Sequence, residues 1–366
     1  MLEIQKYLRS KHPTSAVRHA CEEFDLEVDE KDDLVLFNYG FTGKSKGRRA
    51  GEECRGLVLE KPSWNVVAYP FYRFYNAHEG YAAKIDYSTA TLQKKLDGSM
   101  VTLYPYKGDW HVATRGKLDA SGRVGSWDKT FAQYFWETFQ KYADKSVLNV
   151  AGNSCITMEL TGPDNRVITP YNESALTILM GRDLDSLNEL PPTPLKALSK
   201  LWGIPVVESF SYSTGDHIKN LVKMLPALEE GFVVVDYAHP SLGNFPRVKI
   251  KNPKYLEAHA FIGSGFDIKK AAELVLGGGA DEFVEYFPEY KEILYSIKEK
   301  LACLIEELEG NYKSIKHIES RRDFAFSAQR TKLPWVMFKL RDNPDMAVAS
   351  LVAQTDAETI IKITEI

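Results

Sequence analysis

The sequence predicts an α+β fold in which antiparallel sheets come first and an all-α C-terminal domain follows. From residue 63 to about residue 255, segments rich in β-branched and aromatic residues recur, and many of them alternate apolar with polar positions. Helical segments interrupt these strands without the regular strand–helix alternation of a parallel sheet. After about residue 256 the pattern is helical. We therefore expect a first domain at residues 1–255 and a helical second domain at residues 256–366.

The expected strands follow one another along the first domain. In chain order they are LVLFNYG (34–40), ECRGLVLE (53–60), WNVVAYPF (64–71), MVTLYPY (100–106), WHVATRG (110–116), SCITMEL (154–160), ALTILMG (175–181), GFVVVDY (231–237) and RVKIK (247–251). A short helical pattern precedes them at the N-terminus. Helices are also expected at 131–143, where phenylalanines lie four residues apart, and at 194–203, where a glycine can end the helix.

The second domain contains one long amphipathic pattern. Apolar residues recur at spacings of three and four in a charged background, namely Leu294, Ile297, Leu301, Leu304, Leu308 and Tyr312. Such a stripe is typical of a helix that faces a core. One or two more helices are expected in the final stretch, from residue 346 onward.

Composition excludes several classes of protein. With 44% hydrophobic and 12% aromatic residues, the chain can bury a substantial core, so disorder is excluded. The N-terminus is too polar for a signal peptide, and no apolar run is long enough to span a membrane. The four cysteines are widely spaced and resemble reduced thiols. We expect a monomeric cytoplasmic protein with no membrane partner.

Lys95 is the first candidate for chemistry, because it stands two residues before the Asp97-Gly98 pair. A lysine amine is a nucleophile only when it is deprotonated, which requires desolvation or nearby cations. Attack on the α-phosphate of a nucleotide would give a covalent phosphoramidate. The Asp-Gly pair can turn the chain and leave the amine projecting into a pocket. In isolation, however, the pattern also fits an ordinary surface turn.

Further charged residues occur at strand ends or inside apolar strands. They are Arg55, Arg73, Arg115, Glu159 and Glu230. Arginines of this kind can hold phosphates, and a carboxylate in an apolar strand must face solvent or be paired within a site. Arg55 could equally form a surface salt bridge with Glu53 or Glu60.

Lys249 and Lys251 lie two residues apart, so their side chains point to the same face of the expected strand. Two cations on one face repel each other unless an anion lies between them, and a triphosphate would meet that need. The alternative is an ordinary solvated strand face.

Together, these motifs resemble the covalent nucleotidyltransferases, and within them the bacteriophage RNA ligase 1 family of tRNA-repairing enzymes. The segments that carry the resemblance are FNYGF (37–41), ECRG (53–56), PFYRFYN (70–76), KLDGS (95–99), ELTGPDNRVITPY (159–171), EGFV (230–233) and KIKNPKY (249–255). A fainter likeness extends to GGGADEF (277–283) and DFAFSAQ (323–329). Arg73 and Arg115 stand where the family usually has lysine, and KLDG replaces a more acidic form.

The resemblance implies an ATP-dependent RNA ligase that uses Mg²⁺, with Mn²⁺ as a possible substitute. Lys95 would form lysyl-AMP, AMP would pass to an RNA 5′-phosphate, and an RNA 3′-hydroxyl would then attack the adenylated end. The partner would be single-stranded RNA or a nicked tRNA or stem-loop. The implied catalytic residues are Lys95, Glu159 and Glu230, the implied nucleotide contacts are Tyr39, Arg55, Arg73, Arg115, Lys249 and Lys251, and Asp281 is the implied metal ligand. Tyr255 matches a functional tyrosine of the family, although a core aromatic is the alternative.

Three other functions share parts of this pattern. An ATP-dependent DNA ligase or a GTP-using capping enzyme would also have the lysine, the glutamate and the lysine pair, but both usually carry a β-rich domain after them. A non-catalytic RNA-binding protein with a ligase fold is the remaining alternative. The basic and aromatic segment at residues 319–335 suits RNA contact, or else a packing helix with a solvated edge.

Overall fold

The computed structural model describes residues 1–125, 128–211, 215–262 and 266–365. The chain divides into two compact units, Met1–Ala258 and His259–Ile366. The division lies within helix α7 (Pro253–Ile262), shortly after the boundary expected at Tyr255.

The first unit begins with a small antiparallel sheet covered by helices. The sheet has the order β1 (Leu26–Lys31), β2 (Leu34–Tyr39), β3 (Arg55–Glu60) and β4 (Asn65–Ala68), and the helices are α1 (Glu3–Arg9), α2 (Ala16–Phe24) and α3 (Arg49–Glu52). Alternate residues of β2 point to opposite faces. Val35 and Phe37 pack against the helices, whereas Leu36 packs on the other face, against Tyr104 and its neighbours in the second sheet.

The second sheet is also antiparallel and contains the largest core. Its order is β10 (Ala175–Asp183), β9 (Ser154–Thr161), β7 (Ser99–Tyr106) and β8 (Asp109–Thr114), with α4 (Phe131–Gln140), η1 (Lys145–Ala151), η2 (Pro163–Asn165) and α5 (Pro192–Trp202) in its connections. Phe135 and Phe139 of α4 are fully buried against this sheet, as the four-residue spacing predicts. Gly203 ends α5 in the left-handed conformation, with φ of 71°.

The third sheet supplies most of the segments that form the candidate site. Its order is β11 (Ser209–Ser211), β6 (Thr91–Lys94), β12 (Gly231–Val235), β13 (Arg247–Lys251) and β5 (Tyr75–Asn76), and α6 (Gly215–Met224) packs on it through Ile218 and Val222. The pairing of β5 with β13 is parallel. The sheets are otherwise antiparallel, as expected, and this one parallel pair among the described strands arises because the chain reaches β13 from β5 only after a long crossover.

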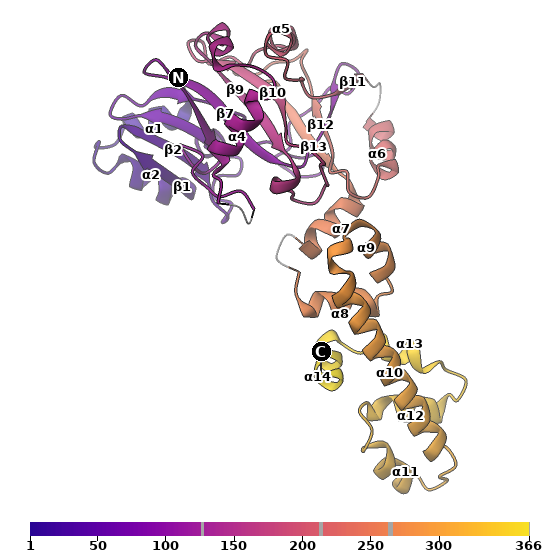
Figure 1. Ribbon diagram of the computed structural model, residues 1–366. Helices are drawn as coiled ribbons and strands as arrows, with labels where there is room; N and C mark the ends of the chain where they lie inside the picture. Colours follow the sequence, from indigo (N-terminus) through magenta and orange to yellow (C-terminus); the bar gives the residue numbers. More distant parts are fainter. Residues whose placement is uncertain (126–127, 212–214, 263–265, 366) are drawn as a thin grey trace. The chain divides into compact units, whose positions relative to one another are not determined.

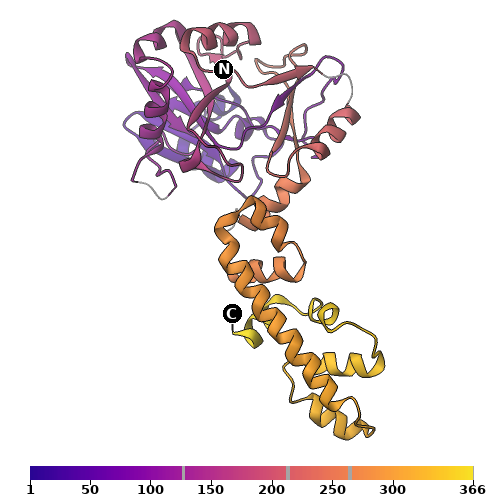
Figure 2. The same cartoon turned by 45° about the vertical axis from the view of Figure 1, so that its right-hand side comes forward.

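The second unit is helical, as the sequence predicts. It continues from α7 with α8 (Ile268–Leu276), α9 (Ala280–Tyr286), η3 (Pro288–Tyr290), α10 (Lys291–Ile315), α11 (Arg321–Ala328), α12 (Pro334–Asp342), α13 (Val348–Val352) and α14 (Ala357–Thr364). Other helices of the unit pack along the long α10, which both views show (Figures 1 and 2). The apolar stripe from Leu294 to Leu308 is buried. Among the helices described, none is long and apolar enough to cross a membrane.

Candidate nucleotide-binding site

A pocket of about 420 Å³ in the first unit brings together most of the residues that the sequence singled out. Those that line it are Arg55, Lys95, Arg115, Glu159, Glu230, Lys249 and Lys251. They come from the first, second and third sheets, so the pocket lies where the three sheets approach one another. Its volume suits a small-molecule ligand.

Lys95 and Lys251 share one carboxylate. Lys95 Nζ lies 2.6 Å from Glu230 Oε2, and Lys251 Nζ lies 2.8 Å from Glu230 Oε1. The strand register explains this arrangement, since Gly231 pairs with Lys251 across β12 and β13, and the backbone N–H of Lys95 donates to the Gly231 carbonyl at 2.9 Å. Lys94 also lines the pocket, but its amine forms an ion pair with Glu229 at 3.3 Å. Of the two adjacent lysines, therefore, Lys95 is the one that shares the Glu230 carboxylate with Lys251.

Asp97 anchors the loop that carries Lys95. Its buried carboxylate accepts the backbone N–H groups of Ile168 and Thr169 at 2.8 and 2.7 Å and the hydroxyl of Tyr255 at 2.6 Å. The sequence indicated only a turn here. The structure assigns Asp97 a second role, as the acceptor that fixes the position of the loop.

Gly98 lets the same loop pass close to β9. A Cβ atom at this position would lie 2.5 Å from the carbonyl oxygen of Leu160, which a larger residue could not tolerate. The close approach lets the Gly98 N–H donate to Glu159 Oε1 at 3.1 Å. Burial raises the pKa of the Glu159 carboxyl to about 7, although Lys95 opposes the shift. The loop thus places a titratable carboxylate beside Lys95.

Lys249 and Arg55 line the pocket, and neither forms an ion pair with another described residue. Burial, together with the charges of Arg55, Lys95 and Lys251, lowers the pKa of Lys249 to about 7. Burial also lowers the pKa of Arg55, and its Nη1 has no hydrogen-bond partner among the described residues. The salt bridges considered for Arg55 do not form, because Glu53 pairs with Arg49 and Glu60 accepts from Tyr106. A buried cluster of this kind favours an anionic ligand.

Tyr39, Arg73 and Arg115 form a stack beside the pocket. The Tyr39 ring centre lies 4.1 Å from the guanidinium carbon of Arg73 and 5.5 Å from that of Arg115. Arg115 lines the pocket, and Tyr39 and Arg73 join it through this stack. Their expected contact with a nucleotide remains a prediction.

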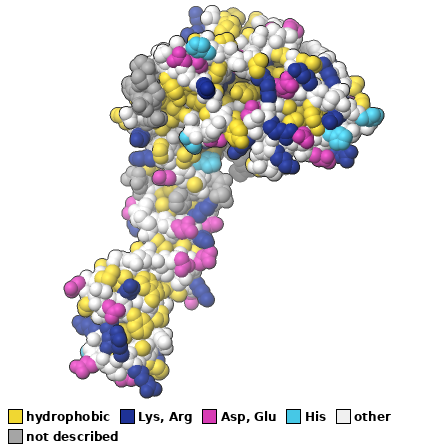
Figure 3. Space-filling view, turned by 180° about the vertical axis from the view of Figure 1, so that it is seen from behind, with side chains coloured by type: hydrophobic (Ala, Val, Ile, Leu, Met, Phe, Trp, Pro, Cys, Tyr) yellow, Lys and Arg dark blue, Asp and Glu magenta, His cyan; other side chains and the backbone are white. Residues whose placement is uncertain are grey.

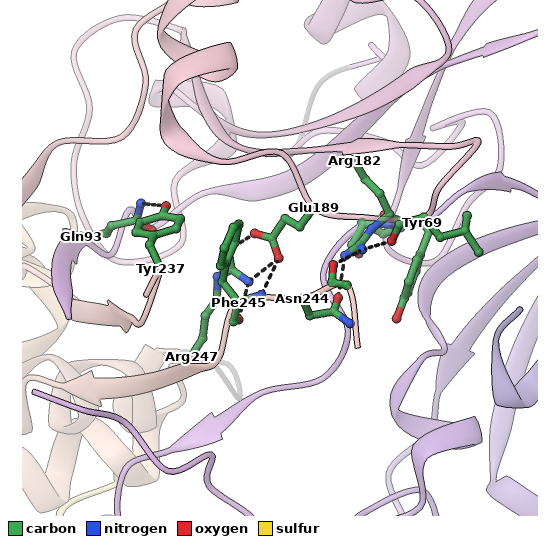
Figure 4. Close-up of polar contacts among 11 residues, drawn as sticks. Tyr69, Gln93, Arg182, Glu189, Tyr237, Asn244, Phe245 and Arg247 are labelled. Carbon is green, nitrogen blue, oxygen red and sulfur yellow. Dashed lines mark hydrogen bonds and ion pairs between the residues drawn. The ribbon is translucent and has the colours of Figure 1, made fainter. Parts of the chain in front are cut away.

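Sequence analysis gave no role to several other residues that line the pocket. Phe71 and Phe74 line the pocket on either side of Arg73 in the sequence. The guanidinium of Arg55 lies over both rings, 5.7 and 5.0 Å from their centres. Their position in the PFYRFYN motif was the sequence signal that could have identified Phe71 and Phe74 as pocket residues. Arg247 also lines the pocket and forms a fully buried ion pair with Glu189 (Figure 4). Its partner is distant in sequence, so no local pattern could have revealed the pair.

A second buried arginine holds the chain segments that lead toward the pocket. Arg182 of β10 is fully buried, and it donates to the carbonyl groups of Tyr69, Leu187 and Gly243 at 2.8, 2.7 and 3.1 Å. It also donates to the side-chain oxygen of Asn244 at 2.7 Å (Figure 4). This guanidinium is satisfied by neutral oxygens, which identifies it as a structural group.

Asp281, the residue expected to bind metal, lies in the second unit. Both of its carboxylate oxygens are 2.8 Å from Lys298 Nζ, and this ion pair lowers its pKa. Across the described parts of the chain, no group of three or more His, Cys, Asp or Glu side chains is placed to hold a metal ion. In the pocket, Glu159 and Glu230 could contribute to a Mg²⁺ site that phosphate oxygens and water complete, which is how this ion commonly binds. Metal binding by Asp281 remains a prediction.

Comparison with known proteins defines the class to which this fold and pocket belong. Residues 53–255, more than half of the chain, match the profile of a family described as RNA ligase. The protein is therefore a member of the RNA ligase family, as the resemblance in its motifs predicted.

Two relatives of this chain are viral proteins. The chain is 27% identical over 360 residues to the RNA ligase of Rhodothermus phage RM378, covering 83% of this chain and 81% of the phage protein. It is 26% identical over 316 residues to an Autographa californica nuclear polyhedrosis virus protein named as a bifunctional polynucleotide kinase/RNA ligase. That match covers 80% of this chain but only 43% of the viral protein.

Two solved structures of RNA ligases show partial similarity to the chain. An archaeal ATP-dependent RNA ligase is similar with a TM-score of 0.47 and 15% identity, covering 93% of this chain and 81% of the archaeal one. A Naegleria gruberi RNA ligase variant with ATP and Mn has a TM-score of 0.38 and 17% identity, covering 48% of this chain and 52% of the other.

Proposed function

We propose that this protein is an ATP-dependent RNA ligase that joins RNA 5′-phosphate and 3′-hydroxyl ends. The observation that carries the proposal is the placement of Lys95 Nζ, 2.6 Å from Glu230, in a pocket that also contains Lys249, Lys251 and Arg55, whose Nη1 has no hydrogen-bond partner among the described residues. Such a site offers one nucleophilic amine and several cations for a triphosphate. Membership of the RNA ligase family supports the choice of reaction.

In the first step, the neutral amine of Lys95 attacks the α-phosphorus of ATP. A P–N bond forms, the bond to the pyrophosphate oxygen breaks, and the amine loses a proton. Glu230 is in hydrogen-bond contact with Nζ and can orient the amine or accept that proton. Lys249 and Lys251 neutralise charge on the triphosphate, so their contribution is greatest in this step.

In the second and third steps, AMP passes from Lys95 to an RNA 5′-phosphate, and an RNA 3′-hydroxyl then displaces AMP to seal the strand. The RNA is single-stranded or a nicked stem-loop such as a tRNA, and the helical region from residue 256 onward selects it. Glu159, which accepts a hydrogen bond from the nucleophile loop, is placed to bind a ribose hydroxyl or the water shell of a metal ion. Bound Mg²⁺ or Mn²⁺ would neutralise phosphate charge during these transfers.

Labelling the protein with ATP tests the proposal directly. Incubation with α-labelled ATP and Mg²⁺, followed by denaturing electrophoresis and peptide mapping, should place AMP on Lys95. Lys95→Met should abolish the label. Lys94→Met is the matched control and should retain it, because Lys94 pairs with Glu229 instead. Label from GTP alone would indicate a capping enzyme, and no label from either nucleotide would indicate a non-catalytic RNA-binding protein.

Sealing assays separate the remaining alternative. Single strands and nicked duplexes of RNA and of DNA, matched in sequence and each with a 5′-phosphate, are offered to the labelled protein. Joining of RNA supports the proposal, whereas joining restricted to nicked duplex DNA would indicate a DNA ligase.

A further inference from the structure

The loop at residues 41–48, between β2 and α3, combines an exposed aromatic ring with a run of basic residues. Its sequence is FTGKSKGR. Phe41 is 91% exposed, which is unusual for so large an apolar side chain. Lys44 and Lys46 are also exposed, and among the residues that the structure describes neither takes part in an ion pair. We call this segment the 41–48 loop.

Hydrogen bonds to the body of the first unit hold the 41–48 loop in place. Ser45 at its centre is fully buried. The N–H of Thr42 donates to Asp25 Oδ2 at 2.7 Å, and the N–H of Gly47 donates to Glu52 Oε1 at 2.9 Å. Arg48 forms an ion pair with Glu23. These anchors engage the neighbouring carboxylates and leave the side chains of Phe41, Lys44 and Lys46 directed to solvent.

The loop is also joined to the candidate nucleotide site. Arg73 Nη1 donates to Ser45 Oγ at 2.8 Å, and Arg73 belongs to the stack with Tyr39 and Arg115 that reaches the pocket. On the other side, Gly47 packs against the ring of Tyr81, which is 56% exposed. Exposed rings and cations thus continue from the pocket rim onto the protein surface.

This combination matches the chemistry of a single-stranded nucleic acid. Lysines attract phosphates, and exposed aromatic rings offer faces on which bases stack. On the face of the first unit drawn in Figure 3, Lys and Arg side chains lie among exposed hydrophobic ones, so surfaces of mixed charged and apolar character occur elsewhere on this unit. A purely solvated loop would explain the lysines but gives no reason to expose Phe41.

We infer that the 41–48 loop holds the single-stranded RNA that approaches the nucleotide pocket, with Lys44 and Lys46 on its phosphates and Phe41 stacked on a base. The inference rests on the proposed function and adds a substrate contact outside the nucleotide site. Phe41, Lys44 and Lys46 are not among the residues that line the nucleotide pocket, so replacing their side chains should leave formation of lysyl-AMP intact.

The test measures RNA binding and adenylation in the same variants of the full chain. Fluorescence anisotropy with labelled single-stranded RNA over a series of salt concentrations compares wild type with Lys44→Ala/Lys46→Ala and with Phe41→Ala. Exposed positions on α5 provide matched controls, Lys196→Ala/Lys200→Ala for charge and Leu201→Ala for apolar surface. Lysyl-AMP formation from ATP confirms that each variant is folded.

The two loop variants should impair RNA binding in different ways. Removing both lysines should reduce the magnitude of the salt slope by about 1.4, because each phosphate contact on a single strand contributes about 0.7. Phe41→Ala should weaken binding roughly 5- to 150-fold with little change in slope, the usual range for loss of one stacked base. Lys44→Arg/Lys46→Arg should restore the slope.

The result distinguishes failure of this inference from failure of the proposed function. If the loop variants and the α5 controls bind RNA equally well while all of them form lysyl-AMP, the loop inference is wrong and the ligase proposal stands. If the wild-type protein forms no lysyl-AMP, the ligase proposal fails, and with it the inference that depends on it.

Discussion

Lys249 allows a quantitative test of the electrostatics of the pocket. Its pKa is lowered to about 7 because the amine is buried and faces the positive charges of Arg55, Lys95 and Lys251. At pH 8, about nine-tenths of the Lys249 amines should therefore be neutral in the free protein. A bound triphosphate supplies the missing negative charge, favours the protonated amine and raises its pKa. Nucleotide binding should consequently draw a proton from the buffer.

The expected uptake depends on pH in a defined direction. Near pH 8, binding should take up about 0.9 proton per nucleotide at Lys249, and near pH 6 only about 0.1, because most amines are then already charged. Isothermal titration calorimetry in buffers of different ionisation enthalpy measures this number. An α,β-methylene analogue of ATP prevents transfer to Lys95 during the titration.

Lys249→Arg is the decisive control, because a guanidinium stays charged throughout this pH range. It should still bind the analogue but take up about 0.9 proton fewer than wild type at pH 8, because Glu159 still titrates in both proteins. Lys249→Met should lose the same part of the uptake and also part of the affinity. Equal uptake at pH 8 in wild type and Lys249→Arg would mean that Lys249 is already protonated in the free protein. The reasoning about the pocket would then be refuted.

Three further predictions concern the parts of the molecule around the pocket. Asp97→Ala should lower the free energy of unfolding by about 3 kcal/mol in urea denaturation, because two backbone N–H groups and a tyrosine hydroxyl lose their acceptor; Asp97→Asn should cost less, and an equal loss would contradict this account. The folded-state pKa of Glu159 lies above its ordinary value of 4.5, so stability is lost as pH rises from about 4.5 to 7. Glu159→Gln should therefore raise the unfolding midpoint at pH 8 but not at pH 4.5, and a pH-independent effect would rule out this titration. A folded truncation ending near residue 260 should still form lysyl-AMP but lose preference for a nicked stem-loop over an unstructured strand; loss of lysyl-AMP would place the C-terminal region in the catalytic site.

The fold could be predicted from the sequence where the signal is local. Alternation of apolar and polar residues identified the main strands, and the three-and-four spacing identified α10. The short strand β5 could not be predicted, since two residues carry no periodicity and its partner β13 lies far along the chain. Pairing of that kind depends on the whole fold.

The candidate site, like the fold, could be predicted from the sequence only in part. Order and residue type were enough to bring Lys95, Glu159 and the lysine pair into one group, and the structure places them in one pocket. What the sequence lacked was the set of supporting contacts. Asp97 and Tyr255 are 158 residues apart in the chain, and neither residue type by itself indicates a hydrogen bond between them.

Arg182 shows what such a supporting contact can achieve. One guanidinium gathers three separate segments, at residues 69–70, 187 and 243–244, whose carbonyl and amide oxygens converge on it. In this respect it acts as a bound cation does in a loop-rich protein, because it links peptide groups from separate segments. A lysine has the charge but not the planar set of five donors, so it could not reach all three segments. We therefore expect the amide protons of these segments to exchange together, as one cooperative unit.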